Sequence, residues 1–221
     1  MTSRLVLSWL WLLAALLAGC VVPTPRATPA APELLAGTLR QFNFRSEFAD
    51  ALAPLRARDW PALVKLARAR LEREPNRGEW WQLAGYGQMQ AGELALARDS
   101  LERAARLLPE EVGIWSILAE AQRRAGNSGA ALRTIERALQ TDPVSTIALV
   151  QQGDLLAEQR RDREALRSFD RALEVDPRDV FAWRSLGQLA RRTGDAAALE
   201  RAVKALRQLY PPFADEIAPA R

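Results

Sequence analysis

The chain has 221 residues, with 31 lysines and arginines, 27 aspartates and glutamates, no histidine and one cysteine. These counts exclude histidine-based acid–base and metal chemistry, and they leave no second thiol for a disulfide or a thiolate zinc site. A net charge of +4, with acids and arginines interspersed along the predicted helices, is not typical of a nucleic-acid-binding protein, which gathers cations on one face.

Residues 1–19 have the pattern of a secretory signal peptide. Arg4 precedes an apolar run from Leu5 to Leu17. These thirteen residues are too few for a membrane-spanning helix, which needs about 20. We therefore expect this segment to direct export and to be removed.

The run ends in Leu-Ala-Gly-Cys at residues 17–20, which resembles the lipobox of bacterial lipoproteins. The resemblance implies that cleavage leaves Cys20 as the first residue, carrying acyl chains such as palmitate that hold the protein to a membrane. Since Val21 follows in place of aspartate, the resemblance implies the outer membrane, with the protein facing the periplasm. The alternative is a plain secretory signal that leaves an unmodified thiol at Cys20.

Residues 20–43 are expected to form the lipidated end and a tether. Residues 21–37 hold four prolines and show no helical periodicity, which indicates an extended spacer. The segment 44–77 is expected to be helical, because Trp60 and Pro61 have the order of a helix start.

A 34-residue period governs the rest of the chain. It is marked by five prolines: Pro75, Pro109, Pro143, Pro177 and Pro211. Bulky residues lie 28 positions before the last four: Trp81, Trp115, Leu149 and Trp183. Small residues lie 24 positions before them: Gly85, Ala119, Gly153 and Gly187. At 17 positions before them, where a tight turn is expected, lie Gly92, Gly126, Arg160 and Gly194.

This order of residues resembles the tetratricopeptide repeat (TPR) family. The resemblance implies an all-α fold, a right-handed superhelical solenoid of antiparallel helix pairs, with four clear repeats over residues 78–213 after a degenerate repeat over 44–77. Residues 214–221 then form a short tail. We expect the end of the chain to be too small for a full capping helix, so that a partner or a second copy covers that end.

The first helix of each pair lines the concave face in this family, and the resemblance therefore implies a protein or peptide partner there. The predicted groove residues are Gln82, Tyr86, Met89, Glu120, Arg123, Arg124, Asp154, Arg184, Gln188, Arg191 and Arg192. Tyr86 and Met89 are expected to offer adaptable apolar contacts. The set lacks the lysine and asparagine pattern by which some family members clamp a free carboxyl terminus.

Two features leave alternatives open. The pairs Arg123-Arg124 and Arg191-Arg192 recur 68 residues apart, and they either hold an acidic peptide or only complement the carboxyl end of their own helix. Trp80, which faces away from Trp81, either packs on residues 44–77 or lies exposed as a binding anchor.

No cofactor, metal or catalytic residue is predicted. We expect a scaffold for assembly of an envelope machine, since the lipid anchor and the closing Leu-Arg-Gln-Leu-Tyr-Pro at residues 206–211 resemble pilotin lipoproteins of type IV pilus secretins. The alternatives are an adaptor for peptidoglycan hydrolases or proteases and an enzyme that uses carboxylates alone. The acids for such an enzyme are Glu120, Asp154 and Glu158.

Overall fold

The computed structural model describes residues 46–218, and every regular element in that range is a helix. The predictions for residues 1–19, Cys20 and the tether lie outside the described residues. In chain order the elements are η1 (Ser46–Phe48), α3 (Ala49–Ala57), α4 (Trp60–Leu71), α5 (Gly78–Gln90), α6 (Leu94–Leu107), α7 (Val112–Arg124), α8 (Ser128–Thr141), α9 (Thr146–Glu158), α10 (Asp162–Val175), α11 (Val180–Thr193), α12 (Ala196–Leu209) and α13 (Pro211–Ile217).

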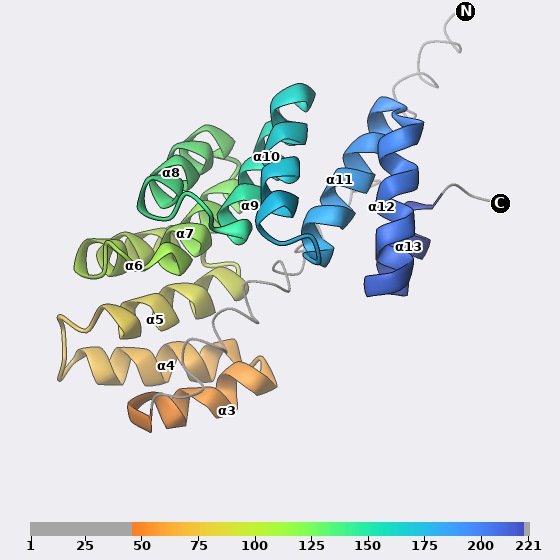
Figure 1. Cartoon of the computed structure of the whole chain (residues 1–221). Coiled ribbons are helices and arrows are strands. Elements are labelled where there is room, and N and C mark those ends of the chain that lie inside the picture. Colours follow the sequence, from red (N-terminus) through yellow and green to blue (C-terminus); the bar gives the residue numbers. More distant parts are fainter. Residues whose placement is uncertain (1–45, 219–221) are drawn as a thin grey trace, which may run out of the picture.

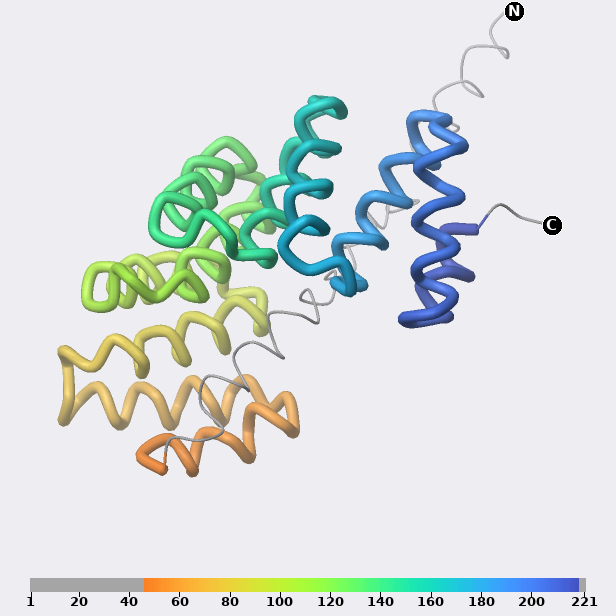
Figure 2. The backbone as a smooth tube through the Cα atoms, viewed as in Figure 1, coloured from red at the N-terminus to blue at the C-terminus, as the bar shows by residue number. Residues whose placement is uncertain are grey.

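The helices form antiparallel pairs that stack in chain order into a curved array, as Figures 1 and 2 show. The pairs α5/α6, α7/α8, α9/α10 and α11/α12 are the four predicted repeats, and α3/α4 forms the degenerate one. The expected all-α solenoid of helix pairs is confirmed. None of these helices combines the length and the apolar character that crossing a bilayer requires.

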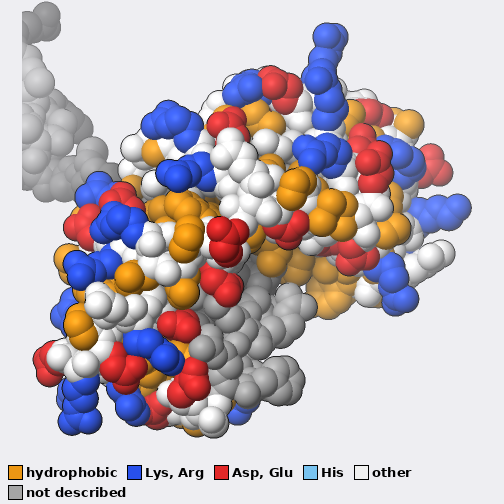
Figure 3. Space-filling model, turned by 60° about the vertical axis from the view of Figure 1, so that its left-hand side comes forward, with side chains coloured by type: hydrophobic (Ala, Val, Ile, Leu, Met, Phe, Trp, Pro, Cys, Tyr) orange, Lys and Arg blue, Asp and Glu red, His pale blue; other side chains and the backbone are white. Residues whose placement is uncertain are grey.

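The first helices of neighbouring pairs contact one another, α7 with α9 and α9 with α11, while each second helix packs against the next first helix. First helices therefore line the inner face of the curve. Figure 3 shows that acidic and basic side chains are interspersed on one face of the molecule, so the charges form no single-sign field there.

Side-chain caps begin several of the helices. An oxygen of the residue before the helix accepts a hydrogen bond from a backbone N–H of the first turn, which contributes about 1 kcal/mol per cap. These capping residues are Asp59, Asn127, Ser145, Asp179 and Asp195.

The repeat tryptophans support the turn that precedes each first helix. Each indole Nε1 donates to a proline carbonyl at 2.8 Å: Trp81 to Pro75, Trp115 to Pro109 and Trp183 to Pro177. In the third repeat Leu149 replaces tryptophan, and the Pro143 carbonyl accepts a hydrogen bond from Arg171 Nη2 at 3.2 Å instead. Arg103 and Arg137, at the equivalent positions, stack on Trp81 and Trp115. The arginine at this repeat position thus stacks on the indole where tryptophan is present and donates to the proline carbonyl itself where tryptophan is absent.

The small residues of the repeat permit close packing within a pair. A Cβ atom on Gly153 would lie 2.3 Å from Cε1 of Phe169 in the second helix. Ala119, at the same repeat position, is 1% exposed. The prediction that these positions let the backbones approach is confirmed.

The turn inside each pair uses a left-handed residue in all five units. Gly92, Gly126 and Gly194 have φ between 78° and 84°, and the arginines at the equivalent positions adopt the same region, Arg58 at 55° and Arg160 at 63°. The turn geometry is therefore kept where the sequence lacks glycine.

The amino-terminal end of the array is covered by η1 and α3. Trp80 is 2% exposed, with the ring of Phe48 at 4.8 Å between centroids and the guanidinium of Arg70 at 5.5 Å. Of the two alternatives for Trp80, packing on residues 44–77 is correct.

The carboxyl-terminal end is covered by α13, so the prediction that this end is too small for a capping helix and needs a partner or a second copy to cover it is wrong. Two prolines begin α13, where their fixed φ suits the first turn. Its Ala214 and Ile217 are 1% and 0% exposed against α11 and α12. Ile217 fills the space beside Gly187, where a Cβ atom would lie 2.3 Å from Ile217 Cδ1. Burial of an apolar face holds this seven-residue helix.

Candidate functional site

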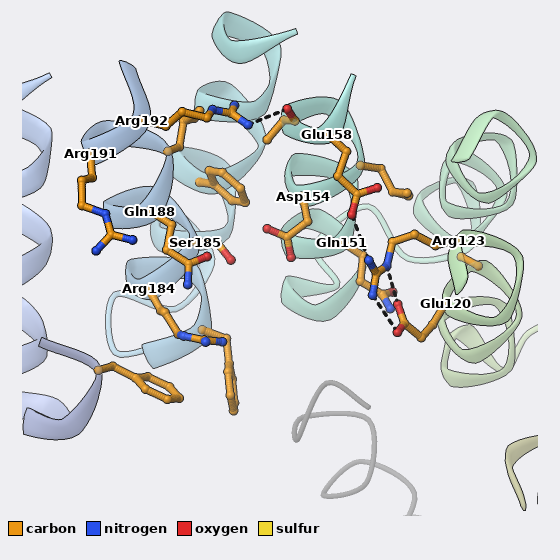
Figure 4. A pocket seen from close by; sticks show the side chains of 17 residues that line it. Glu120, Arg123, Gln151, Asp154, Glu158, Arg184, Ser185, Gln188, Arg191 and Arg192 are labelled. Atoms are coloured by element: carbon orange, nitrogen blue, oxygen red, sulfur yellow. Dashed lines mark hydrogen bonds and ion pairs between the residues drawn. The ribbon is translucent and has the colours of Figure 1, made fainter. Parts of the chain in front are cut away.

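A cavity of about 910 Å³ opens on the concave face, lined chiefly by α7, α9 and α11 and closed at one end by Phe213 of α13. Its apolar lining consists of Ala119, Leu155, Ala157, Phe169, Phe181, Leu189 and Phe213. Its polar lining consists of Glu120, Arg123, Gln151, Asp154, Glu158, Arg184, Ser185, Gln188, Arg191 and Arg192 (Figure 4). We call this cavity the groove. An apolar surface edged by oriented polar groups is the usual character of a binding site.

Seven of the eleven predicted groove residues line this cavity. They are Glu120, Arg123, Asp154, Arg184, Gln188, Arg191 and Arg192. They come from three helices that are 34 residues apart in sequence, and the common period brings them together.

At the α7 end the groove is organised around Glu120, whose side chain is 5% exposed. Arg123 donates to it from Nε at 2.8 Å and from Nη2 at 2.9 Å, and Arg124 Nε donates at 2.7 Å. Arg123 Nη1 also donates to Glu158 Oε1 of α9 at 2.9 Å, as Figure 4 shows. The hydrogen bonds that Arg123 donates to Glu120 raise the pKa of the Arg123 guanidinium, so this bridge between α7 and α9 remains charged.

This network bears on the carboxylate-only enzyme. Such an enzyme needs an acid with a free oxygen that reaches substrate. Both oxygens of Glu120 and one of Glu158 accept hydrogen bonds from the arginines of α7. Glu120 therefore anchors the arginines of α7, and Glu158 links α9 to α7 through Arg123.

The two arginine pairs differ in their surroundings. Arg124 has a side chain only 10% exposed, so its prediction as a partner contact is wrong: the buried Glu120 carboxylate draws it inward. Arg192 donates to the Ala157 carbonyl at 2.9 Å and forms an ion pair with Asp162, which ties α11 to the preceding repeat. The two bonds of Arg192 thus reach α9 and α10. The capping alternative instead places such bonds on carbonyls of the arginine's own helix.

At the α13 end, Arg184 binds the carboxylate of Glu216 with both arms of its guanidinium, at 2.8 and 2.7 Å. Gln188 Nε2 donates to the same carboxylate at 2.8 Å. Arg191 Nη1 donates to the main-chain carbonyl of Glu216 at 2.9 Å. The Arg184 guanidinium, followed by Gln188, holds the pKa of the Glu216 carboxyl below its usual range.

The prediction that Gln82, Tyr86 and Met89 line an open groove is wrong. These side chains are 1%, 0% and 0% exposed. Trp60 meets the Tyr86 ring edge-on at 5.7 Å between centroids, and Met89 belongs to a core cluster that includes residues of α4 and α7. Burial raises the pKa of Tyr86 to about 12. The amino-terminal half of the concave face is thus filled by the protein itself.

The predicted set omits several lining residues, among them Gln151, Phe181 and Phe213. Phe181 precedes Ser185 by one turn of α11, so extending the face by one turn toward the helix start identifies it. Phe213 lies on α13, a helix that the repeat pattern does not predict. Among residues 46–218, no cluster of three or more aspartate, glutamate, cysteine or histidine side chains is placed to hold a metal ion.

Comparison with known proteins agrees with this geometry. Residues 82–146 and 150–216 match a family model described as tetratricopeptide repeat. Among solved structures, a crystal structure of MamA has a TM-score of 0.59 at 20% identity and covers 76% of this chain and 93% of its own. MamA from residue 41 to its end, from Desulfovibrio magneticus RS-1, has a TM-score of 0.63 at 14% identity, covering 78% and 97%.

YrrB, described as a TPR protein with an unusual peptide-binding site, has a TM-score of 0.57 at 18% identity and covers 82% of this chain and 96% of its own. At such low identities these likenesses establish the fold alone. The search of curated proteins found no match.

Proposed function

Because this chain belongs to the tetratricopeptide repeat family, we propose that it is a non-catalytic scaffold whose groove holds a segment of a partner protein. The observation that carries the proposal is the groove itself, which combines aromatic walls with charged side chains from three successive repeats. A solenoid presents much surface for its mass, and its concave face suits an extended partner segment. The peptide-binding site stated for YrrB, a protein of the same fold, adds support.

The finer proposal is that the scaffold is tied to the outer membrane by lipid on Cys20 and faces the periplasm. Its support is the order of the apolar run, small residues and cysteine at residues 5–20. Two or three acyl chains make attachment lasting, because each buried methylene contributes about 0.8 kcal/mol.

We further propose that the partner belongs to an envelope machine, with secretin assembly for type IV pili as the leading case. This rests on the lipid anchor and on the likeness of residues 206–211 to pilotin lipoproteins. An adaptor for peptidoglycan hydrolases or proteases is the competing case, and the identity of the partner separates the two.

The test is affinity capture from solubilised cell envelopes with two double variants. Arg184→Glu with Arg191→Glu reverses groove charge, whereas Arg167→Glu with Arg207→Glu makes the same change on exposed positions of α10 and α12 that do not line the groove. The proposal predicts that the first variant loses its partners and the second keeps them, with equal helicity by circular dichroism. Equal capture by both variants contradicts a role for the groove. Captured pilus proteins support the leading case, and captured cell-wall enzymes support the other.

A further inference from the structure

The α13 end of the groove holds a carboxylate in a set of donors that projects from a single face of α11. The donors are Arg184, Gln188 and Arg191, spaced three or four residues apart, and the carboxylate belongs to the chain's own Glu216. A bidentate guanidinium with a supporting amide is a geometry that selects a carboxylate over other acceptors.

This arrangement is open to exchange. The side chains of Arg184 and Glu216 are 34% and 38% exposed, and Arg184, Gln188 and Arg191 line the groove (Figure 4). A half-exposed ion pair contributes little to stability. What holds α13 in place is the burial of Ala214 and Ile217, so the Glu216 side chain can leave its donors while α13 stays docked.

The donor set also carries more positive charge than Glu216 neutralises. Arg184 and Arg191 supply two cations, and the bond from Arg191 goes to a main-chain carbonyl rather than to a carboxylate. Two guanidinium groups thus share one carboxylate, so an acid that enters from the groove meets positive charge that Glu216 alone does not balance.

Aromatic side chains adjoin this charge. The rings of Phe181 and Phe213 lie 5.8 Å apart between centroids, and the Arg184 guanidinium lies 4.9 Å from the centroid of Phe213. This cation–π contact attracts the guanidinium of Arg184 in addition to its ion pair with Glu216. A ligand seated here has a carboxylate beside an apolar side chain.

We propose that Arg184, Gln188 and Arg191 form a carboxylate-binding subsite of the groove, that Glu216 occupies it when no partner is present, and that an acidic residue of the partner, next to an apolar one, displaces Glu216. The inference rests on the proposed function, since it assigns the chemistry of the partner segment. It deepens that proposal by giving the groove an internal competitor.

The experiment measures binding of three fluorescent peptides to the full-length protein in detergent by anisotropy. The first peptide contains Phe-Glu and has an amidated end, the second has Phe-Gln and an amidated end, and the third has Phe-Gln and a free terminal carboxylate. The protein variants are Glu216→Gln, the matched control Asp215→Asn on the exposed side of α13, and Arg184→Ala with Glu216→Gln.

If Glu216 occupies the donor set most of the time, a peptide can bind only to the fraction of molecules in which the set is free. Removing the Glu216 carboxylate therefore tightens the apparent affinity by the inverse of that fraction. We expect Glu216→Gln to bind the Phe-Glu peptide about tenfold more tightly than wild type, Asp215→Asn to stay within about twofold, and the added Arg184→Ala to abolish the gain. A matching gain with the free-terminus peptide, in addition to the gain with the Phe-Glu peptide, supports the subsite and shows that it also accepts the carboxylate of a chain end.

The proposal is overturned if Glu216→Gln and Asp215→Asn tighten binding equally, since that is a net-charge effect. It is also overturned if the Phe-Glu and amidated Phe-Gln peptides bind Glu216→Gln alike. Either result leaves the proposed function standing when the Arg184→Glu and Arg191→Glu variant still loses partners in the envelope capture. If Glu216→Gln gives no specific gain in peptide binding and the Arg184→Glu and Arg191→Glu variant also keeps its partners, both the proposed function and the subsite are contradicted.

Discussion

Arginine at a left-handed turn is the clearest departure from the repeat at the scale of single residues. Arg160 has φ of 63° at a position where the first, second and fourth repeats carry glycine. An L-residue with a side chain pays about 1 kcal/mol or more for this conformation, because its Cβ crowds the following carbonyl oxygen. The helices on either side of this turn, α9 and α10, pack against each other.

Replacing Arg160 with glycine is expected to raise the free energy of unfolding by about 0.5–1 kcal/mol, since relief of the strain exceeds the added freedom of glycine in the unfolded chain. Arg160→Ala is the control, because it removes the charge and keeps the strained backbone. Urea unfolding followed by circular dichroism measures both variants. A gain with alanine equal to that with glycine shows that charge, and not φ, is responsible.

Single-residue exposure marks the limit of what the sequence predicts about the groove. Gln82 and Arg184 occupy the same repeat position, three repeats apart, yet Gln82 is 1% exposed and the Arg184 side chain is 34% exposed. The period predicts toward which face a side chain points. The exposure of a side chain depends on what covers that face. Met89, on the same helix as Gln82, is packed in a core cluster with residues of α4 and α7, whereas Arg184 lines an open cavity.

At the scale of elements, the helices of the repeats were predictable and α13 was not. The four helix pairs follow from the period, the bulky and small positions and the turn glycines. Residues 211–217 carry no complete repeat, and seven residues are too few for helix propensity alone to indicate a stable helix. Their stability comes from Ile217 seated beside Gly187, a tertiary contact that the sequence pattern does not reveal.

Truncating this contact is expected to loosen one end of the array only. Ile217→Ala removes a fully buried side chain, which costs about 2–4 kcal/mol locally. Because the repeats of a solenoid contact chiefly their neighbours, amide protection should fall in α11, α12 and α13 and stay unchanged in α5 and α6. Hydrogen exchange with mass spectrometry measures this, with Asp215→Ala as the exposed control. Uniform loss of protection along the chain contradicts nearest-neighbour stability.

The ion pair of Glu216 predicts how α13 responds to pH. Arg184 and then Gln188 lower the pKa of this carboxyl in the folded state, relative to about 4.3 for an unpaired glutamate. Its stabilising contribution is therefore complete above the unfolded value and is lost as the pH falls through the lowered folded value. Amide exchange of α13 should differ between wild type and Glu216→Gln at pH 7, and the difference should shrink as the pH falls below the unfolded value. A difference that persists in acid means that shape, and not charge, distinguishes the two side chains.

At the scale of the whole molecule, the chain combines the helical array of residues 46–218 with an amino-terminal segment whose role is inferred from its sequence. The helix pairs, their order and their stacking follow from the repeat. The position of the groove along the array does not, because it depends on which repeats leave the concave face unfilled. Here the buried Tyr86 closes the face near α5, and the cavity opens at α7, α9 and α11.

The proposed lipid anchor on Cys20 makes a prediction for the intact protein. Cys20→Ala removes the proposed acylation site, so the variant should leave the membrane fraction or accumulate with residues 1–19 uncleaved. Cell fractionation with intact-mass analysis of the purified protein measures both outcomes. Cys20→Ala that remains in the outer membrane with a processed terminus excludes the lipid anchor.

The proposal that the concave groove holds a partner protein is tested most directly by photo-crosslinking in intact cells. A photoreactive residue at Ser185 of α11 is compared with one at Glu200 of α12. Ser185 lines the groove, whereas Glu200 is exposed on a second helix and does not line it. A photoreactive residue at 185 should give a discrete adduct with one partner protein, and the same residue at 200 should give none. Adducts from residue 200 alone, or the same adducts from both positions, would contradict the claim that the concave groove holds the partner.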